Sequence, residues 1–249
     1  KDKSKPHDYY CYVFNSHCNY EKFRMYFDIP TEKCIVIKNG CTNFPTPKQH
    51  KKGDPVRLLF HPTPWRGLNI MLAAMQHLKR DDVKLDVYSS TQVYGDAFRA
   101  ANDHQYVGLY KQASELPNVN YIGYKPNQYI LDNIQNYQIF AYPNIWEETF
   151  CISALEAMSA GLHVITTNHG ALYETCSEWP VYVNYEKNWD HLEKCCAYAV
   201  DASVYYIHRP EVFDFLCKQA EFYKRFYSWE KKGAEWTQFL EGALHARRK

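Results

Sequence analysis

Short apolar runs alternate along the chain with longer segments of helical spacing. Runs rich in β-branched and aromatic residues predict strands at residues 34–38, 56–60, 84–89, 119–123, 138–143, 163–167 and 181–183. Segments with apolar residues three or four positions apart predict helices at 67–80, 126–136, 150–160, 189–200 and 210–246. The first of these helices has its apolar residues at positions 68, 71, 72, 75 and 78.

This alternation predicts an α/β fold with a doubly wound, mainly parallel, Rossmann-like sheet. Strands that consist of nearly continuous apolar runs are buried on both faces, and the helices between them supply the cover. In such folds ligands bind beyond the carboxyl ends of the strands. We therefore expect the loops after residues 60, 89, 123, 143 and 167 to converge on one cleft. Residues 41–55, rich in Pro, Lys and polar residues, are predicted to form a linker.

The composition indicates a globular protein without a general attraction to polyanions. Of the 249 residues, 46% are hydrophobic, which is enough for a substantial core. Lys and Arg number 29 against 28 Asp and Glu, so no broad electric field favours nucleic acid or an anionic membrane. No apolar stretch approaches the ~20 residues that span a bilayer, and no signal segment opens the chain. We expect no nucleic-acid partner, no membrane span and a cytoplasmic protein.

The cysteines indicate neither a disulfide framework nor a zinc site. Their number is nine, which is odd, and no two are separated by two residues as in a C-x-x-C pair. A reducing compartment is the simplest explanation, and we expect no metal and no cofactor. The start at Lys1, without a methionine, suggests a piece of a longer chain.

Two phosphate-binding signatures are missing from the sequence. The glycines do not fit the G-x-G-x-x-G pattern of dinucleotide-binding proteins or the G-x-x-x-x-G-K-[ST] pattern of P-loop proteins. This argues against an NAD enzyme and against a P-loop NTPase. Phosphate binding remains open, because a helix N-terminus supplies free N–H groups and a positive dipole end by itself.

The stretch "IWEETFCISALEAMSAG", residues 145–161, carries two acids around a predicted helix start. Glu148 precedes the start near Phe150, and Glu156 lies within the helix, ~9 Å further along at ~1.5 Å per residue. If the amides of Phe150 and Cys151 held a diphosphate, Glu156 would meet a ribose and Glu148 a transferred sugar. Alternatively, Glu148 only complements the helix dipole and Glu156 faces water.

The longer stretch "YPNIWEETFCISALEAMSAGLHVITTNHGALYET", residues 142–175, resembles the donor-binding signature of family 4 retaining glycosyltransferases of the GT-B type. In that signature a proline, here Pro143, precedes two glutamates with seven residues between them, and a strand and a glycine-containing loop ending in Glu follow. The matching residues are Glu148, Phe150, Leu155, Glu156, Ala157, Met158 and Gly161. The resemblance implies that this chain is mainly the C-terminal, donor-binding half of a GT-B fold.

Two further segments resemble donor-binding parts of the same family. In "LLFHPTPWRGLNIMLAAM", residues 58–75, Arg66 and Gly67 match positions that approach the donor phosphates, and His61 stands where the family often has Arg. In "VNYIGYKPNQYI", residues 119–130, the resemblance places Tyr124 and Lys125 beside the nucleobase.

The resemblance also implies a domain organisation. Residues 1–52 would be the end of an N-terminal, acceptor-side half with a linker, 53–225 the donor-binding domain, and 226–249 a helix crossing back to the first half. The sequence departs from the family where His163 replaces a proline and where Tyr173 replaces the proline before Glu174. Most of an acceptor domain is missing, so we expect it in a longer parent chain, and this piece alone could be inactive.

The implied function is metal-independent, hexosyltransferase-like transfer of a sugar from a nucleotide-diphosphate sugar, with retention, to a hydroxyl of a glycan, lipid or protein. The candidate catalytic residues are Glu148 and Arg66, and the candidate donor-binding residues are Glu156, Phe150, Cys151, Ile152, His61, Gly67, Tyr124, Lys125 and Pro143. Two alternatives stay open: a non-catalytic nucleotide-sugar or carbohydrate binding module of a larger protein, and a GT-B-like isomerase or phosphorylase.

Overall fold

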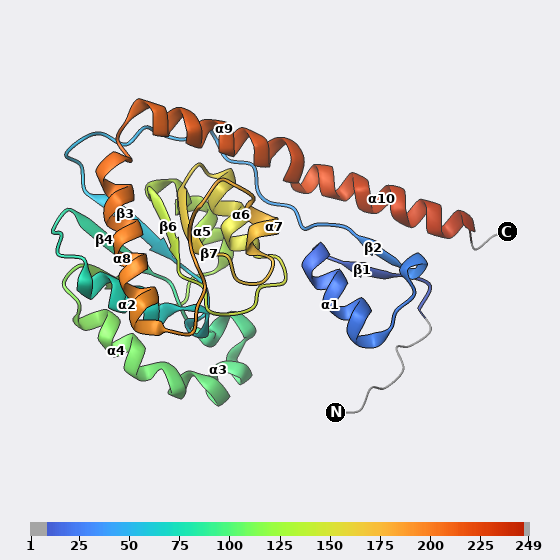
Figure 1. The fold of residues 1–249 in the computed structure, drawn as a ribbon, viewed down its shortest axis with the longest axis horizontal. Helices are drawn as coiled ribbons and strands as arrows, with labels where there is room; N and C mark the ends of the chain where they lie inside the picture. The colour runs from blue at the N-terminus through green and yellow to red at the C-terminus, as the bar shows by residue number, and fades with distance from the viewer. Residues whose placement is uncertain (1–8, 247–249) are drawn as a thin grey trace.

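A six-stranded parallel sheet forms the centre of the computed structural model, which describes residues 9–246 (Figure 1). The spatial order is β5-β4-β3-β6-β7-β8, and every pair of neighbours is parallel. The strands are β3 (Val56–Phe60), β4 (Val83–Val87), β5 (Val119–Tyr121), β6 (Ile139–Tyr142), β7 (His163–Thr167) and β8 (Val181–Val183). The predicted doubly wound α/β fold is confirmed.

Helices cover both faces of this sheet. The connection from β3 to β4 runs towards one edge of the sheet, and the connection from β6 to β7 runs towards the opposite edge. Because both crossovers are right-handed, the helices in these two connections lie on opposite faces of the sheet. On one face α2 (Leu68–His77) packs against α8 (Trp189–Tyr206), and on the other α6 (Ile152–Ser159) packs against α9 (Pro210–Tyr227). The strand order reverses between β3 and β6, which is where such folds bind ligands.

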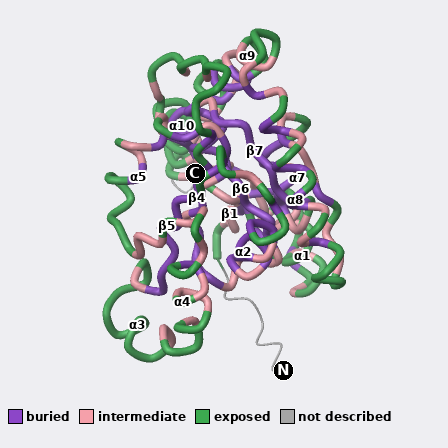
Figure 2. Tube along the Cα trace, turned by 90° about the vertical axis from the view of Figure 1, so that its left-hand side faces the viewer, coloured by how far each residue is buried: buried purple, intermediate pink, exposed green. Residues whose placement is uncertain are grey.

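The core follows the two central strands. Leu58, Leu59 and Phe60 of β3 are fully buried, as are Phe140 and Tyr142 of β6. Figure 2 shows the buried residues gathered on the strands and on the inner sides of their helices, with exposed residues on α3 and the outer helices. The loops that leave β3 and β6 therefore start from rigid, close-packed strands.

The predicted strand at 34–38 does not belong to the large sheet. Its residues form β2 (Cys34–Val36), which pairs in parallel with β1 (Tyr12–Phe14) in a separate two-stranded sheet, called the small sheet below. Helix α1 (His17–Phe27) lies between these two strands in the chain. The stretch 42–55 between the two sheets contains no helix or strand. Periodicity identifies a strand but not its neighbours, and this separation was not predictable from apolar runs alone.

The predicted helix at 210–246 is interrupted at Ser228, which separates α9 from α10 (Trp229–Ala246). The Ser228 backbone is extended, with φ −59° and ψ 148°. Around it Cys41 N–H donates to the Tyr227 carbonyl at 2.7 Å, and Trp229 N–H donates to the Cys41 carbonyl at 3.3 Å. The prediction of one helix was wrong because apolar spacing is helical on both sides of the break. A hydrogen-bonded contact with a residue far away in sequence causes the break.

Several short helices were not predicted. They are α3 (Asp96–Asn102), α4 (Val107–Glu115) and α7 (Leu172–Cys176), while α5 (Asn127–Asn133) lies where a helix was expected. Single turns of 3-10 helix occur at η1 (Thr31–Lys33), η2 (Pro64–Arg66), η3 (Thr91–Tyr94), η4 (Asp103–Tyr106) and η5 (Ile134–Asn136). No residue of α3 is buried, so that helix has no apolar stripe for a periodicity argument to detect.

Two expectations about the chain can be compared with residues 9–246. All nine cysteines are free thiols in the structure. Within that range no helix combines the length and the apolar character needed to cross a membrane.

Candidate functional site

A cleft of about 570 Å³ lies at the carboxyl ends of the central strands, where the strand order reverses. The loops after β3, β4, β5 and β6 line it, as the sequence predicted. The loop after β7 was also expected there, but none of its residues lines the cleft. Instead it holds the backbone of Glu148 in place. Gly170 forms a β-bridge with Glu148, and Ala171 N–H donates to the Glu148 carbonyl at 2.8 Å.

Most of the residues singled out from the sequence come together in this cleft. Those that line it are His61, Arg66, Tyr124, Lys125, Glu148, Phe150, Cys151 and Ile152. Gly67, Pro143 and Glu156 are not among the lining residues.

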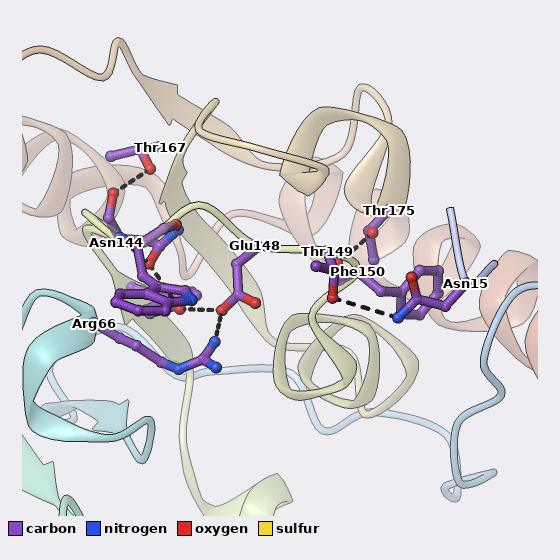
Figure 3. A network of polar contacts seen from close by, with 10 residues as sticks. Asn15, Arg66, Asn144, Glu148, Thr149, Phe150, Thr167 and Thr175 are labelled. Atoms are coloured by element: carbon purple, nitrogen blue, oxygen red, sulfur yellow. Dashed lines mark hydrogen bonds and ion pairs between the residues drawn. The ribbon is translucent and has the colours of Figure 1, made fainter. Parts of the chain in front are cut away.

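Arg66 and Glu148 form an ion pair, in which Arg66 Nη1 donates to Glu148 Oε1 (Figure 3). The Tyr142 hydroxyl donates to the same oxygen at 2.5 Å, and the Glu148 side chain is only 6% exposed. Burial lowers the pKa of the Arg66 guanidinium, but the charges and hydrogen bonds of Glu148 and Tyr142 together raise it more, so the net pKa is above the ordinary value and Arg66 stays charged. The sequence suggested separate ligand contacts for these two residues; the structure joins them.

The loop that carries Glu148 is fixed by buried polar residues that sequence reasoning missed. The Asn144 side-chain oxygen accepts from Trp146 N–H at 2.9 Å and lies 2.9 Å from the Tyr142 hydroxyl. Thr167 Oγ1 donates to the Asn144 carbonyl at 2.6 Å (Figure 3). The sequence did contain a sign of this network, namely Tyr142 and Asn144 at the end of an otherwise apolar strand. Buried polar groups need hydrogen-bond partners, so these two residues predict such a network.

Helix α6 begins two residues later than the sequence predicted. Phe150 is buried and its carbonyl accepts a hydrogen bond from Thr175 Oγ1, which holds it outside the helix. Cys151 is the N-cap, with φ 85° in the left-handed region that costs energy for a non-glycine residue. The free amides in the first turn are therefore those of Ile152 and Ser153, which line the cleft, instead of those of Phe150 and Cys151.

Two side chains that line the cleft, Cys151 and His61, are uncharged near neutral pH. Burial raises the pKa of the Cys151 thiol well above its ordinary value, so it is not a thiolate nucleophile. Burial lowers the pKa of His61 to about 4, so its imidazole is neutral near pH 7. His61 therefore does not supply the positive charge that the family's Arg would bring to this position, and Arg66 and Lys125 are the cations on the cleft lining.

Gly67 and Pro143 bring the loops after β3 and β6 into contact. Gly67 has φ 108°, and a Cβ atom at this position would lie 2.2 Å from the Pro143 carbonyl oxygen. Only glycine permits this approach, which holds Arg66 beside the Glu148 loop. Both residues shape the cleft from below its surface.

Glu156 is a buried acid without a partner. It is 5% exposed, so the alternative that it faces water is wrong. Within residues 9–246 its carboxylate makes no hydrogen bond or ion pair, and burial raises its pKa to about 7. An unpaired buried acid next to a cleft is typical of functional sites, but a ligand contact for Glu156 stays a prediction.

The variant Glu156→Gln should be more stable than the wild type at pH 8 but not at pH 5. With a folded-state pKa of about 7, the folded protein holds this proton more tightly than the unfolded chain, so stability is lost as the pH rises through 7. The difference in free energy of unfolding should grow by about 2 kcal/mol from pH 5 to pH 8, measured by urea titration. The exposed Glu178→Gln is the control, and an equal pH dependence in the two variants would contradict the assignment.

The small sheet supplies the remaining wall of the cleft. Asn15 and Asn39 line it, and Asn15 Nδ2 donates to Thr149 Oγ1 at 3.4 Å. The Glu174 carboxylate accepts from the N–H groups of His17 and Cys18 at the start of α1, both at 2.9 Å, and pairs with Lys38 Nζ at 3.0 Å. Burial raises the Glu174 pKa, but these donors lower it more, so the carboxylate is charged.

Comparisons with known proteins agree with this architecture. The family described as "Glycosyl transferases group 1" matches residues 48–202. A search of curated proteins found no match.

Within residues 9–246, no group of three or more His, Cys, Asp or Glu side chains is arranged to hold a metal ion.

Several solved structures are similar to the chain in fold. A sucrose-phosphate synthase from Thermosynechococcus elongatus matches 95% of this chain with a TM-score of 0.74 and 18% identity. A glycosyltransferase from Rickettsia africae matches 93% with a TM-score of 0.71 and 16% identity. HepE from Anabaena, determined in complex with UDP-glucose, matches 94% with a TM-score of 0.68 and 15% identity. The chain spans 59%, 63% and 64% of their respective lengths.

Proposed function

Because the chain belongs to the group 1 glycosyltransferases, we propose that it binds a nucleotide-diphosphate sugar and transfers the sugar to an acceptor hydroxyl. The observation that carries the proposal is the meeting of the α6 N-terminus, Arg66 and Glu148 in one cleft. Helix amides and a guanidinium suit phosphate oxygens, and a carboxylate suits sugar hydroxyls. The complex of HepE with UDP-glucose supports this class of donor.

The donor would lie across the switch point. Its diphosphate would meet the first amides of α6 at Ile152 and Ser153, which is two residues further along than the sequence suggested. Its base would point to Tyr124 and Lys125 after β5, and its sugar to Glu148. The proposed ribose contact of Glu156 requires the ligand to reach one turn into α6, where the unpaired carboxylate lies.

The chemistry would consist mainly of stabilising the leaving group. When the bond between the sugar and the phosphate oxygen breaks, negative charge grows on the nucleoside diphosphate. Arg66 uses one nitrogen for Glu148, and its other N–H groups remain able to donate to a phosphate. Donors of this kind contribute ~2 to 4 kcal/mol each to the transition state. Transfer with retention and without a metal ion is part of the proposal.

We extend the proposal to the parent protein. The chain would be mainly the C-terminal half of a family 4 GT-B enzyme, with residues 1–52 ending an acceptor-side half, 53–225 binding the donor and 226–249 crossing back. Support comes from Asn15 and Asn39, by which the small sheet already contributes to the cleft. The acceptor would be a hydroxyl of a glycan, lipid or protein. Nine free cysteines favour a reducing compartment and so a cytoplasmic location.

Calorimetry with UDP, ADP and GDP tests donor binding. The wild type should bind at least one of them, and Arg66→Ala should weaken that binding about 10- to 100-fold, because it removes a charged hydrogen-bond donor to phosphate. Arg80→Ala is a matched control, since Arg80 pairs with Asp82 and Asp201 and does not line the cleft. Equal affinities in wild type and Arg66→Ala would contradict the proposed site.

Release of nucleoside diphosphate from a panel of nucleotide sugars tests transfer. A donor-binding module without catalysis is the second candidate, because the chain spans only 59% of the sucrose-phosphate synthase chain it resembles. Binding without release, in both this chain and a longer parent chain, would support the module. Release that depends on an added acceptor would support the transferase and identify the donor.

A further inference from the structure

A tyrosine forms part of the cleft wall on the side of β4 and β5. Tyr88 follows β4, is one of the lining residues of the cleft, as are Tyr124 and Ile130, and is 8% exposed. Its ring lies at right angles to that of Tyr137, with centroids 6.5 Å apart. Under the proposed function, this is the end of the cleft that faces the nucleobase.

The hydroxyl of Tyr88 contacts the hydroxyl of Tyr137, which does not line the cleft, and starts a buried hydrogen-bond chain. The Tyr137 hydroxyl donates its proton to Asp86 Oδ2 at 2.8 Å. Its oxygen must therefore accept the proton of the Tyr88 hydroxyl, which lies 2.7 Å away. All protons in the chain point from the cleft wall towards the Asp86 carboxylate.

The far end of the chain is held firmly. Arg57 Nη2 pairs with Asp86 Oδ2 at 2.7 Å, and Asn120 Nδ2 donates to Asp86 Oδ1 at 3.3 Å. The Arg57 guanidinium also lies 4.8 Å from the centre of the Tyr137 ring. Asp86 and Tyr137 are 7% and 5% exposed, so the hydrogen bond between them is shielded from water, although the Arg57 side chain is 45% exposed. The rotation of the Tyr88 ring is thus set by charged groups outside the cleft.

We propose that the Asp86–Tyr137–Tyr88 chain fixes the ring of Tyr88 as the wall against which the donor's nucleobase packs, with Tyr137 as a positioning residue. The inference rests on the proposed function and adds a specific contact to it. With its only proton committed to Tyr137, Tyr88 offers the ligand an apolar ring instead of a hydrogen-bond donor. An immobile ring also spares the ligand the entropy cost of ordering it.

Calorimetry on Tyr137→Phe tests the inference with UDP, ADP, GDP and inorganic pyrophosphate as probes. Affinity for the best nucleoside diphosphate should fall about 5- to 20-fold, because the Tyr88 hydroxyl loses its acceptor and the ring its orientation. Affinity for pyrophosphate should stay unchanged, since Arg66 and the α6 amides are untouched. Tyr88→Phe should act like Tyr137→Phe, and the double variant should lose no more than either single one.

Tyr110→Phe is the matched control, because its hydroxyl also donates to a carboxylate, Asp103 Oδ1 at 3.0 Å, and it does not line the cleft. It should bind all probes as the wild type does. Equal nucleotide affinity in Tyr137→Phe and the wild type, a parallel loss of pyrophosphate affinity, or an additive double variant would each overturn this inference alone. If the wild type binds none of UDP, ADP and GDP, the proposed function fails, and this inference fails with it.

Discussion

Glu148→Gln should lower kcat/KM for release of nucleoside diphosphate by about 100-fold, or ~2.7 kcal/mol in the transition state. The carboxylate receives hydrogen bonds from Arg66 and Tyr142 on one oxygen, and its other oxygen remains for a sugar hydroxyl. Glutamine keeps the size but removes the charge, so Arg66 loses its counter-ion and the sugar loses its strongest acceptor. The measurement is an initial rate with the donor identified by the panel.

The neighbouring residue provides a control for Glu148→Gln. The Glu147 side chain is 57% exposed and pairs with Lys22 of α1 at the protein surface. Because exposed ion pairs contribute little, Glu147→Gln should change the rate by less than about threefold. Where the chain alone shows no turnover, the affinity for nucleotide sugar relative to free nucleoside diphosphate replaces the rate. A Glu148→Gln variant no weaker than Glu147→Gln would exclude Glu148 from the site.

Gly67→Ala should destabilise the protein by about 3 to 5 kcal/mol. Two independent costs add at this position. The backbone has φ 108°, which L side chains rarely adopt, and the new Cβ would lie 2.2 Å from a backbone oxygen of Pro143 that cannot move without shifting the β6 loop. The free energy of unfolding can be measured by urea titration followed by circular dichroism.

Gly233→Ala gives the opposite expectation in the same assay. Gly233 lies inside α10, and an added Cβ there would have nothing within 4 Å. Alanine in a helix interior is more favourable than glycine by about 0.5 to 1 kcal/mol, so this variant should be slightly more stable than the wild type. If both variants changed stability equally, the contact between the β3 and β6 loops would not be the cause.

Much of the fold was predictable because its signals are local. The strand β6 is apolar throughout, β3 is apolar except for Arg57, and β7 is buried along its whole length. Glycine, proline and helical spacing mark the elements between them. The break at Ser228 was not predictable, since it depends on hydrogen bonds with Cys41, which lies 187 positions earlier. Likewise, α3 buries no residue and leaves no pattern for a sequence argument to find.

The sequence allowed us to predict which residues form the site better than which of them contact one another. Glu148 and Arg66 could be named from residue type and position, but not their mutual ion pair, because their relative position depends on the approach of Gly67 to Pro143. The start of α6 was misplaced because the Phe150 carbonyl has a side-chain partner, Thr175, 25 residues away. The alternative that Glu156 faces water followed from the usual place of mid-helix glutamates, whereas α6 is buried almost entirely.

The contact between Cys41 and Ser228 has a mechanical consequence. The chain enters the large domain beside Cys41 and leaves it beside Ser228, and these two crossings are hydrogen-bonded neighbours. Both covalent connections from the large sheet to the small sheet and α10 thus pass through one hydrogen-bonded point. The opposite end is held by Glu174 on the N-terminus of α1. The Asn15–Thr149 hydrogen bond and the Lys22–Glu147 ion pair join the same two parts, so several separate contacts hold the cleft wall that carries Asn15 and Asn39.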